Sequence, residues 1–231
     1  MTGVTVRVPA KLNLQLAVGP PRADGYHDLV TVFHAVSLFD EITAEPAGRD
    51  KVTVSGEGAD RVPADGDNLA LRAAAALRAA VPSAPCVHIT IAKRIPVAAG
   101  LAGGSGDAAA ALDRQRARAA EPVPAEPALD AALMSALRSG DARLVGRTLS
   151  NDLQPAALSL FPALRKTLAA GLELGALGAL VSGSGPTCVF LAASADRALD
   201  LAASLSGAGV CRSVARASGP VPGATIISGA R

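Results

Sequence analysis

A glycine-dense loop that runs directly into a helix is the feature that most constrains this chain. Residues 95–112 read IPVAAGLAGGSGDAAAAL, a proline-led loop followed by an alanine-rich stretch without glycine or proline. Four of the residues from 100 to 106 are glycines, whose backbone amides no Cβ shields. The helix predicted from about Asp107 adds first-turn amides that have no partner within it, at the positive end of the helix dipole. Such amides bind anions, so the loop predicts a phosphate cradle.

Two better-known phosphate loops fit this stretch less well. A Walker loop requires a lysine after its second glycine, but no lysine follows Gly104. A dinucleotide fingerprint fits loosely at Gly104, Gly106 and Ala109, but it should be followed by a strand that ends in an acidic residue. The chain instead continues into the Pro/Glu-rich stretch EPVPAEP at 121–127. A glycine turn that only begins an ordinary helix stays open as an alternative.

Composition and charge exclude several function classes. The formal net charge of the 231 residues is +2, which lacks the basic excess typical of nucleic-acid binding. Three cysteines without a CxxC pair indicate neither a zinc site nor a disulfide framework. The N-terminal residues lack the apolar run of a signal peptide, and the uncharged run 174–195 is interrupted by SGSGP. We therefore expect a cytoplasmic protein with no nucleic-acid partner, no membrane partner and no metal held by protein side chains.

Apolar periodicity predicts an α+β fold. In the first half, strands are predicted at 4–18 with a bend at Pro9, 29–38, 41–46, 50–56 and 85–96, and a helix at 66–81 capped by Asp67 or Asn68. In the second half, helices are predicted around 129–137 and at 142–149, 155–176 and 194–207. Two strands are predicted around a glycine turn within 177–193, and closing strands are predicted at 210–217 and 224–228. At EPVPAEP the residue pattern changes from strand-rich to mixed helix and strand, which predicts two domains of residues 1–120 and 121–231.

Two further stretches carry residues suited to ligand binding. Tyr26 and His27 follow a glycine turn, and Tyr26 is the only tyrosine in a chain without tryptophan. Such a pair can stack on a ring and hydrogen-bond to it, although a tyrosine packed at a domain edge is equally consistent. The stretch VSGSGPTCVF places an amide-rich turn at Ser182–Gly185, where a plain hairpin turn is the alternative.

Together these stretches resemble the GHMP-type small-molecule kinases. PAKLNLQLAV and RADGYHDLVTVFHAVSLFDEI are similar to the N-terminal signature of the branch that acts on a cytidine diphosphate-linked substrate. IPVAAGLAGGSGDAAA resembles the ATP loop of that branch, and VSGSGPTCVF resembles its C-terminal glycine motif. The resemblance covers nearly the whole chain in the family's order. It implies a two-domain α+β fold, with a left-handed βαβ-type ATP-binding domain at 1–120 and a ferredoxin-like domain at 121–231.

The resemblance also implies a reaction and a set of site residues. The γ-phosphoryl group of ATP, with Mg²⁺, would be transferred to a hydroxyl of cytidine diphosphate-linked methylerythritol, in non-mevalonate isoprenoid biosynthesis. Lys11 would be the catalytic-site lysine, Tyr26 and His27 would contact the cytidine ring, and the enzyme would be a monomer or weak homodimer. Further substrate contacts would come from Asn13, Ser184 and Thr187. The ATP loop would consist of Pro96, Val97, Ala98, Ala99, Gly100, Leu101, Ala102, Gly103, Gly104, Ser105 and Gly106.

Two departures from the family pattern bear on activity. Gly106 stands where the family usually carries a small hydroxyl residue, so one phosphate or metal contact is expected to be missing. The family's G-S-D-V-P-F-like motif, whose aspartate acts as the base, is absent from the sequence. After Ala111 or Leu112 the sequence resembles a stretch that lies beyond that motif, so some tens of residues are missing. Neither Asp107 nor Asp113 matches the catalytic aspartate.

Three hypotheses follow from the resemblance and its departures. The first is an internally shortened kinase of this branch. The second is a catalytically inactive nucleotide-binding protein that keeps the phosphate cradle and the Tyr26–His27 pair. The third is another GHMP activity, such as a homoserine or mevalonate-type kinase. The Tyr26–His27 pair argues against the third, because those substrates have no base on which to stack.

Overall fold

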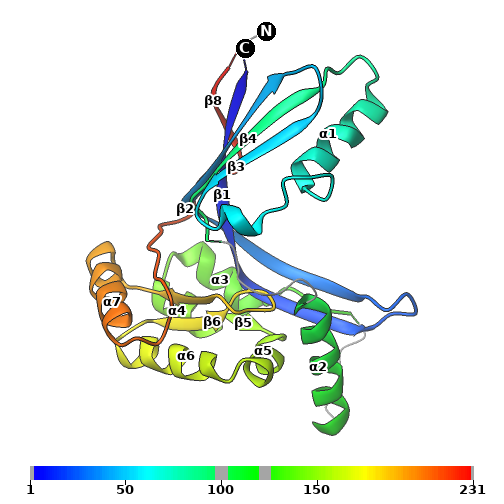
Figure 1. The fold of residues 1–231 in the computed structure, drawn as a ribbon. Helices are drawn as coiled ribbons and strands as arrows, with labels where there is room; N and C mark the ends of the chain where they lie inside the picture. The colour runs from blue at the N-terminus through cyan, green and yellow to red at the C-terminus, as the bar shows by residue number, and fades with distance from the viewer. Residues whose placement is uncertain (1–2, 97–103, 120–125, 230–231) are drawn as a thin grey trace. The chain divides into compact units, whose positions relative to one another are not determined.

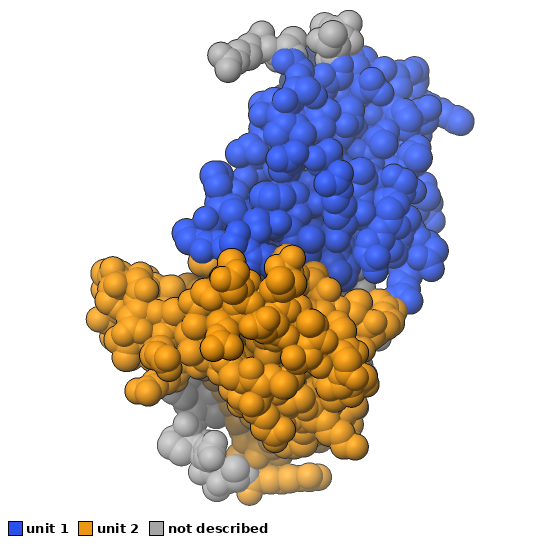
Figure 2. All heavy atoms as spheres, turned by 90° about the vertical axis from the view of Figure 1, so that its left-hand side faces the viewer, with its two compact units in different colours: residues 1–10, 35–97, 217–231 blue, residues 11–34, 98–216 orange. Residues whose placement is uncertain are grey.

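The computed structural model describes residues 3–96, 104–119 and 126–229, which form two compact units. Unit 1 comprises residues 1–10, 35–97 and 217–231, and unit 2 comprises residues 11–34 and 98–216 (Figure 2). The units interleave along the sequence because two long strands, β1 (Val4–Pro21) and β2 (His27–Pro46), each run from one unit into the other.

The two units do not follow the division predicted from the sequence. That division placed one boundary after residue 120, within residues 120–125, which lie outside the described part of the chain. Contacts divide the chain differently because each strand of the β1–β2 pair contributes one half to each unit. Domains of residues 1–120 and 121–231 therefore stay a prediction about the family's organisation.

Unit 1 is a sheet with a helix packed against it (Figure 1). β3 (Lys51–Gly56) pairs in parallel with β4 (Val87–Lys93), and β4 pairs antiparallel with the second half of β2. β2 neighbours β1, and β8 (Thr225–Ser228) pairs antiparallel with the start of β1. Val52, Ile89 and Ile91 of the sheet are buried against the apolar residues of α1 (Leu69–Ala80). A short 3-10 helix, η1 (Ala59–Arg61), precedes α1.

Unit 2 packs helices against the other halves of β1 and β2. β5 (Ser150–Asn151) pairs in parallel with β1, and β6 (Gly178–Val181) pairs antiparallel with β7 (Cys188–Leu191). The helices are α2 (Gly104–Ala119), α3 (Ala131–Ser139), α4 (Ala142–Thr148), α5 (Gln154–Leu160), α6 (Ala163–Glu173) and α7 (Ala195–Gly207).

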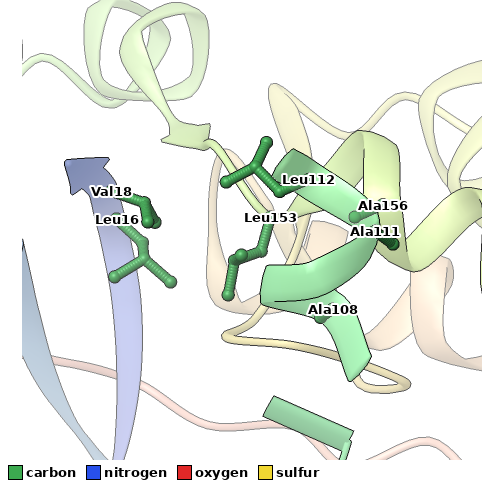
Figure 3. Close-up of a cluster of buried hydrophobic side chains, with 7 residues drawn as sticks. All are labelled: Leu16, Val18, Ala108, Ala111, Leu112, Leu153 and Ala156. Carbon is green, nitrogen blue, oxygen red and sulfur yellow. The ribbon is translucent and has the colours of Figure 1, made fainter. Parts of the chain in front are cut away.

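The core that fixes α2 within unit 2 is built from small and branched side chains (Figure 3). Leu16 and Val18 of β1 face the helix, and Leu153 and Ala156 complete the cluster. On α2 itself, Ala108, Ala111 and Leu112 are buried at helical spacing. This apolar stripe explains why the alanine-rich stretch folds as a helix against this strand.

Several elements match the prediction from periodicity. Asn68 caps α1 by accepting a hydrogen bond from the backbone N–H of Ala70, as predicted. The two strands around the glycine turn within 177–193 are confirmed as β6 and β7, and the helix ending at Gly207 is confirmed as α7. No helix among the described residues is long and apolar enough to cross a membrane.

Other elements differ from the prediction. β1 continues through Pro9 without ending, and the stretches 29–38 and 41–46 belong to the single strand β2. The predicted helix 155–176 is two helices, because Pro162 follows Phe161 and a residue before proline disfavours the helical conformation. The predicted strand at 210–217 is wrong. Those residues are irregular and pair with no strand of the described chain.

Candidate active site

A row of polar side chains on β1 forms the centre of the candidate site in unit 2. Lys11, Asn13 and Gln15 alternate with apolar residues and therefore share one face of the strand. The exposed Lys11 donates from Nζ to Asn13 Oδ1 at 2.9 Å, and Nζ lies 5.1 Å from the centre of the Phe33 ring. Asn13 is only 4% exposed and donates from Nδ2 to Thr31 Oγ1 at 2.8 Å. Asn13 thus fixes the position of the Lys11 ammonium group.

Further hydrogen bonds hold this row in place. The Thr31 hydroxyl donates to the backbone carbonyl of Gln15 at 2.7 Å. The buried Gln15 side chain donates from Nε2 to the carbonyl of Ala128 at 2.8 Å and accepts from the N–H of Asp130 at 2.9 Å. Asp130 in turn caps α3. The strand that carries Lys11 is therefore tied to the start of a helix more than 100 positions away in the sequence.

The glycine turn between β6 and β7 is held by a buried asparagine. Gly183 and Gly185 have φ values of 60° and 86°, which favour glycine. Asn151 Nδ2 donates to the carbonyls of Val181 at 2.6 Å and Gly183 at 2.7 Å. Within the turn, the N–H of Ser182 donates to the Thr187 carbonyl at 2.8 Å. The shape of the turn is therefore determined by both its glycines and its side-chain support.

This turn lies beside the lysine of β1. A Cβ built on Gly183 would stand 3.9 Å from Asn13 Oδ1, the atom that accepts from Lys11. Ser184 is half-buried in the turn, and Thr187 at its end is exposed. The structure thus brings together Lys11, Asn13 and the glycine turn, which the sequence separates by some 170 residues.

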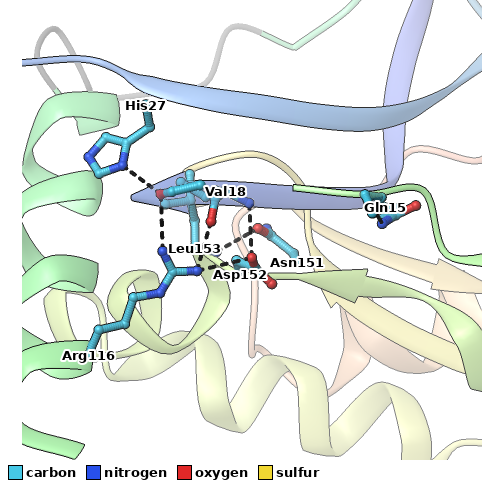
Figure 4. A network of polar contacts seen from close by, with 9 residues as sticks. Gln15, Val18, His27, Arg116, Asn151, Asp152 and Leu153 are labelled. Carbon is cyan, nitrogen blue, oxygen red and sulfur yellow. Dashed lines mark hydrogen bonds and ion pairs between the residues drawn. The ribbon is translucent and has the colours of Figure 1, made fainter. Parts of the chain in front are cut away.

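The structure separates the side chains of Tyr26 and His27. The Tyr26 side chain is exposed, with 73% of the residue accessible, whereas the His27 side chain is only 8% exposed. His27 Nδ1 forms a hydrogen bond with the carbonyl of Gly19 at 2.9 Å, and Nε2 lies 3.4 Å from Asp113 Oδ2. Figure 4 shows the imidazole directed toward the end of β1. The exposed ring available for stacking is therefore that of Tyr26, and a base contact by His27 stays a prediction.

Sequence reasoning missed the arginine that holds the end of β1. Arg116 of α2 donates to the carbonyls of Val18 at 2.9 Å and Gly19 at 3.2 Å, and lies 3.2 Å from Asp152 Oδ2 (Figure 4). The same Asp152 oxygen accepts from the N–H of Val18 at 2.9 Å. In the sequence, Arg116 is one of several charges on a polar helix, so nothing distinguished it from a solvated residue.

Most of the predicted ATP loop lies outside the described residues. Pro96 is exposed at the end of the described stretch, and residues 97–103 are not described. Gly104, Ser105 and Gly106 form the first turn of α2, which begins three residues before the predicted start at Asp107. The phosphate cradle therefore stays a prediction about this loop.

A second residue missed by sequence reasoning, Asp40, holds the segment that leads into the loop in unit 1. Asp40 Oδ1 accepts from the backbone N–H of Arg94 at 2.7 Å and of Ile95 at 2.9 Å, and Oδ2 pairs with the Lys93 ammonium group. Burial by itself would raise the pKa of this carboxyl group. The hydrogen bonds from Ile95, Lys93 and Arg94 outweigh burial and lower the pKa below its ordinary value. The residues just before Pro96 are thus fixed by one ionised carboxylate.

The carboxylates of the described chain do not form a metal cluster. No group of three or more His, Cys, Asp or Glu side chains gathers in residues 3–96, 104–119 and 126–229 with the spacing of metal ligands. Lys11 contacts an amide and an aromatic ring, and Asp113 contacts His27.

Comparison with known proteins identifies the family. The family model described as "GHMP kinases N terminal domain" matches residues 68–138, and "GHMP kinases C terminal" matches residues 133–211. A 4-diphosphocytidyl-2-C-methyl-D-erythritol kinase from Thermobifida fusca is 47% identical over 303 residues, covering 98% of this chain and 99% of the relative. A protein of the same name from Mycolicibacterium smegmatis is 44% identical, covering 97% and 92%.

Solved structures agree with these relatives in fold. A crystal structure of 4-(cytidine 5'-diphospho)-2C-methyl-D-erythritol kinase superimposes with a TM-score of 0.60 at 28% identity, covering 88% of this chain and 95% of that one. A putative homoserine kinase from Listeria monocytogenes gives a TM-score of 0.61 at 17% identity, covering 98% and 100%, and shows the fold alone.

The alignment lengths also confirm that this chain is shorter than its relatives. The alignment with the Thermobifida fusca protein extends over 303 residues, whereas the chain has 231, so at least 72 aligned positions have no counterpart here. The two-domain α+β architecture implied by the resemblance is confirmed, in an incomplete form. With 47% identity across nearly its whole length, the chain belongs to the 4-diphosphocytidyl-2-C-methyl-D-erythritol kinases, a family of GHMP kinases.

Proposed function

We propose that this chain carries the ligand-binding scaffold for ATP-dependent phosphorylation of the hydroxyl of 4-diphosphocytidyl-2-C-methyl-D-erythritol. The relatives that bear this substrate in their names support the assignment. The observation that carries it within the structure is the meeting of Lys11, Asn13 and the glycine turn at Gly183. Phosphoryl transfer depends on positioning the reactants and neutralising charge on oxygen, which a fixed ammonium group and backbone amides supply.

Lys11 acts as a fixed positive charge in this proposal. Its ammonium group donates to Asn13 Oδ1 and lies over the Phe33 ring, 5.1 Å from the ring centre. A charged lysine cannot accept the proton of the substrate hydroxyl group. Lys11 therefore holds phosphate oxygens or stabilises the developing alkoxide, and the base must be another group.

The glycine turn and Tyr26 bind the substrate in this proposal. Amides of the turn, with Ser184 and Thr187, face the phosphates of the substrate beside Asn13. The exposed ring of Tyr26 stacks on cytosine, and His27 contacts the same base. The enzyme is proposed to act in the cytoplasm as a monomer or weak homodimer.

ATP is bound by the loop from Pro96 to Gly106, whose last residues begin α2. Mg²⁺ would neutralise phosphate charge when bound. Its usual ligands are phosphate oxygens of the nucleotide, waters and one or two carboxylates, and the described residues gather no group of three or more potential metal ligands. The missing hydroxyl at Gly106 would weaken this arrangement further.

A second candidate function is nucleotide binding without turnover. It is favoured by the shortened alignment, because the relatives carry at least 72 positions that this chain lacks. The catalytic aspartate implied by the resemblance belongs to the missing segment. In that case the scaffold binds ATP and cytidine diphosphate but transfers phosphate slowly.

Titration calorimetry with two ligands tests the proposed substrate class. Stacking of a base on an aromatic ring contributes roughly 1–3 kcal/mol. Tyr26→Ala should therefore weaken binding of cytidine diphosphate by about tenfold or more, while ATP binding stays near that of the parent protein. Tyr26→Phe is the matched control and should retain most of the affinity. Equal losses for both ligands would show a structural role for Tyr26 and contradict the assignment of the base site.

A further inference from the structure

A continuous chain of hydrogen bonds lies behind the ammonium group of Lys11. Lys11 Nζ donates to Asn13 Oδ1 at 2.9 Å, and Asn13 Nδ2 donates to Thr31 Oγ1 at 2.8 Å. The Thr31 hydroxyl then donates to the backbone carbonyl of Gln15 at 2.7 Å. Three of these residues belong to β1 and Thr31 belongs to β2, and all four lie in unit 2. The chain therefore joins an exposed charge on one strand to a hydroxyl group on the other.

Each bond of this chain has only one possible direction. An ammonium group has donors and no acceptor, so the amide atom that faces Lys11 must be the oxygen of Asn13. A backbone carbonyl can only accept, so the Thr31 hydroxyl gives its single proton to Gln15. The hydroxyl then has only lone pairs to offer to Asn13, and only the NH₂ side of the amide can donate to them. Both ends of the Asn13 side chain thus require the same orientation.

Burial makes this orientation dependent on Thr31. Asn13 is 4% exposed, so little water can replace a protein partner of its NH₂ group. A buried donor that loses its acceptor carries the full cost of its desolvation. Loss of the Thr31 hydroxyl would therefore favour rotation of the amide toward another acceptor, and that rotation takes Oδ1 away from Lys11.

We propose that Thr31 is a positioning residue for Lys11, acting through the amide of Asn13. The hydroxyl fixes the amide, and the amide presents Oδ1 to the ammonium group. The positive charge is thereby held beside the glycine turn at Gly183. Position 31 thus requires a hydroxyl group and not only a side chain of that shape. This inference rests on the proposed role of Lys11 in holding phosphate oxygens.

The side-chain amide of Asn13 is a direct probe of this arrangement in the free protein. The sequence contains three asparagines, Asn13, Asn68 and Asn151, so isotope labelling of asparagine side-chain nitrogen gives three amide groups in a nuclear magnetic resonance spectrum. Asn68 and Asn151 donate to backbone carbonyls and serve as internal references. In Thr31→Val, hydrogen exchange of the Asn13 amide with solvent should be about three- to tenfold faster, the range for one lost hydrogen bond, with both references unchanged. Thr31→Ser keeps the hydroxyl and should keep the slower exchange.

Calorimetry with phosphate-bearing ligands tests the effect on Lys11. The probe ligands are ATP and cytidine diphosphate, and Lys11→Met identifies the ligand whose phosphates Lys11 holds. Thr31→Val should weaken binding of that ligand by about three- to tenfold, and Thr31→Ser should retain most of the affinity. In the Lys11→Met background, Thr31→Val should cause no further loss, because the two residues act in series. Thr43→Val is the matched control, because it removes a hydroxyl from the same strand where the partner is Thr5, and it should leave the affinity unchanged.

Three results would overturn the proposal: unchanged exchange of the Asn13 amide in Thr31→Val, equal affinities of Thr31→Val and Thr31→Ser, or an additive loss in the Lys11→Met background. If the parent protein binds neither ligand, or Lys11→Met binds both as the parent does, the proposed function is contradicted instead. Exchange of the Asn13 amide needs no ligand and still decides whether Thr31 holds that amide. If circular dichroism shows that Thr31→Val does not fold, Thr31→Ala takes its place, and unchanged exchange and affinity in that variant contradict the proposal.

Discussion

Replacement of Asp40 is expected to destabilise the protein strongly and in a pH-dependent way. Asp40 is 9% exposed, its Oδ1 accepts from two backbone amides, and its Oδ2 pairs with Lys93, whose side chain is 14% exposed. Asp40→Ala removes all three contacts and leaves a largely buried ammonium group unpaired, which typically costs about 3–5 kcal/mol. Asp40→Asn keeps one oxygen for the amides but loses the ion pair, at about 1.5–3 kcal/mol. Both losses are large against a total of roughly 5–15 kcal/mol.

The pH dependence follows from the lowered pKa of Asp40. Because the folded pKa lies below the ordinary value of 3.8, folding favours the carboxylate, and its contribution is complete above that value. The contribution is lost as the pH falls through the lowered pKa. The difference in unfolding free energy between the parent protein and Asp40→Asn should therefore be largest at neutral pH and shrink on acidification below 3.8.

Urea unfolding followed by circular dichroism measures these differences. Lys93→Met is the control, because it removes the cation while Asp40 keeps both amide donors, and it should cost less than Asp40→Ala. A loss below about 1 kcal/mol for Asp40→Ala, the centre of the range for ordinary substitutions, would refute the reasoning. A difference between the parent and Asp40→Asn that stays constant into acid would refute the role of the carboxylate charge.

Three further predictions concern the loops and a thiol. Gly103→Val places a branched side chain where phosphate oxygens should approach the backbone. ATP affinity measured by calorimetry should therefore fall, while the circular dichroism spectrum stays unchanged. Full ATP affinity in the folded variant would exclude the phosphate cradle. Asn151→Ala leaves the carbonyls of Val181 and Gly183 without their donor, at about 1–3 kcal/mol for each buried group, and thermal unfolding should shift to lower temperature. An unchanged midpoint would show that water replaces the asparagine. Burial raises the pKa of Cys188 to about 11, so this thiol should react slowly with a disulfide reagent at neutral pH, and rapid labelling located by peptide mass spectrometry would contradict its burial.

The types of most elements could be predicted from the sequence, but their extents could not. Alternating apolar residues identified β1 and β2, and the glycine turn correctly separated β6 from β7. Local signals could not show that β2 continues through 39 and 40, because this continuity depends on pairing with strands distant in sequence. The run at 210–217 alternates like a strand, yet it has no ladder partner in the described chain.

The candidate site was predictable to the extent that its residues lie in recognisable motifs. Lys11, Asn13 and the glycine turn were identified by resemblance, and the structure brings them together. Asp40 and Asn151 were missed because their partners lie 30 to 55 positions away and neither residue differs locally from a surface polar group.

The sequence also could not show that Tyr26 and His27 differ in exposure. Tyr26 directly precedes β2 and is exposed, whereas the side chain of His27, the first residue of that strand, is 8% exposed. A contact of either side chain with a base stays a prediction.

The most direct test of the central claim is a coupled ADP-release assay with 4-diphosphocytidyl-2-C-methyl-D-erythritol and ATP. It compares this chain with a version that has a family-like segment restored after Ala111, and calorimetry measures ligand binding by both. The account predicts that the chain binds ATP and cytidine diphosphate. It also predicts that ADP release is slower than in the restored version by about 10²–10⁴-fold, the usual contribution of a positioned base. Substrate-dependent ADP release at the full rate from the short chain would contradict the account and show that the missing segment does not carry the essential base.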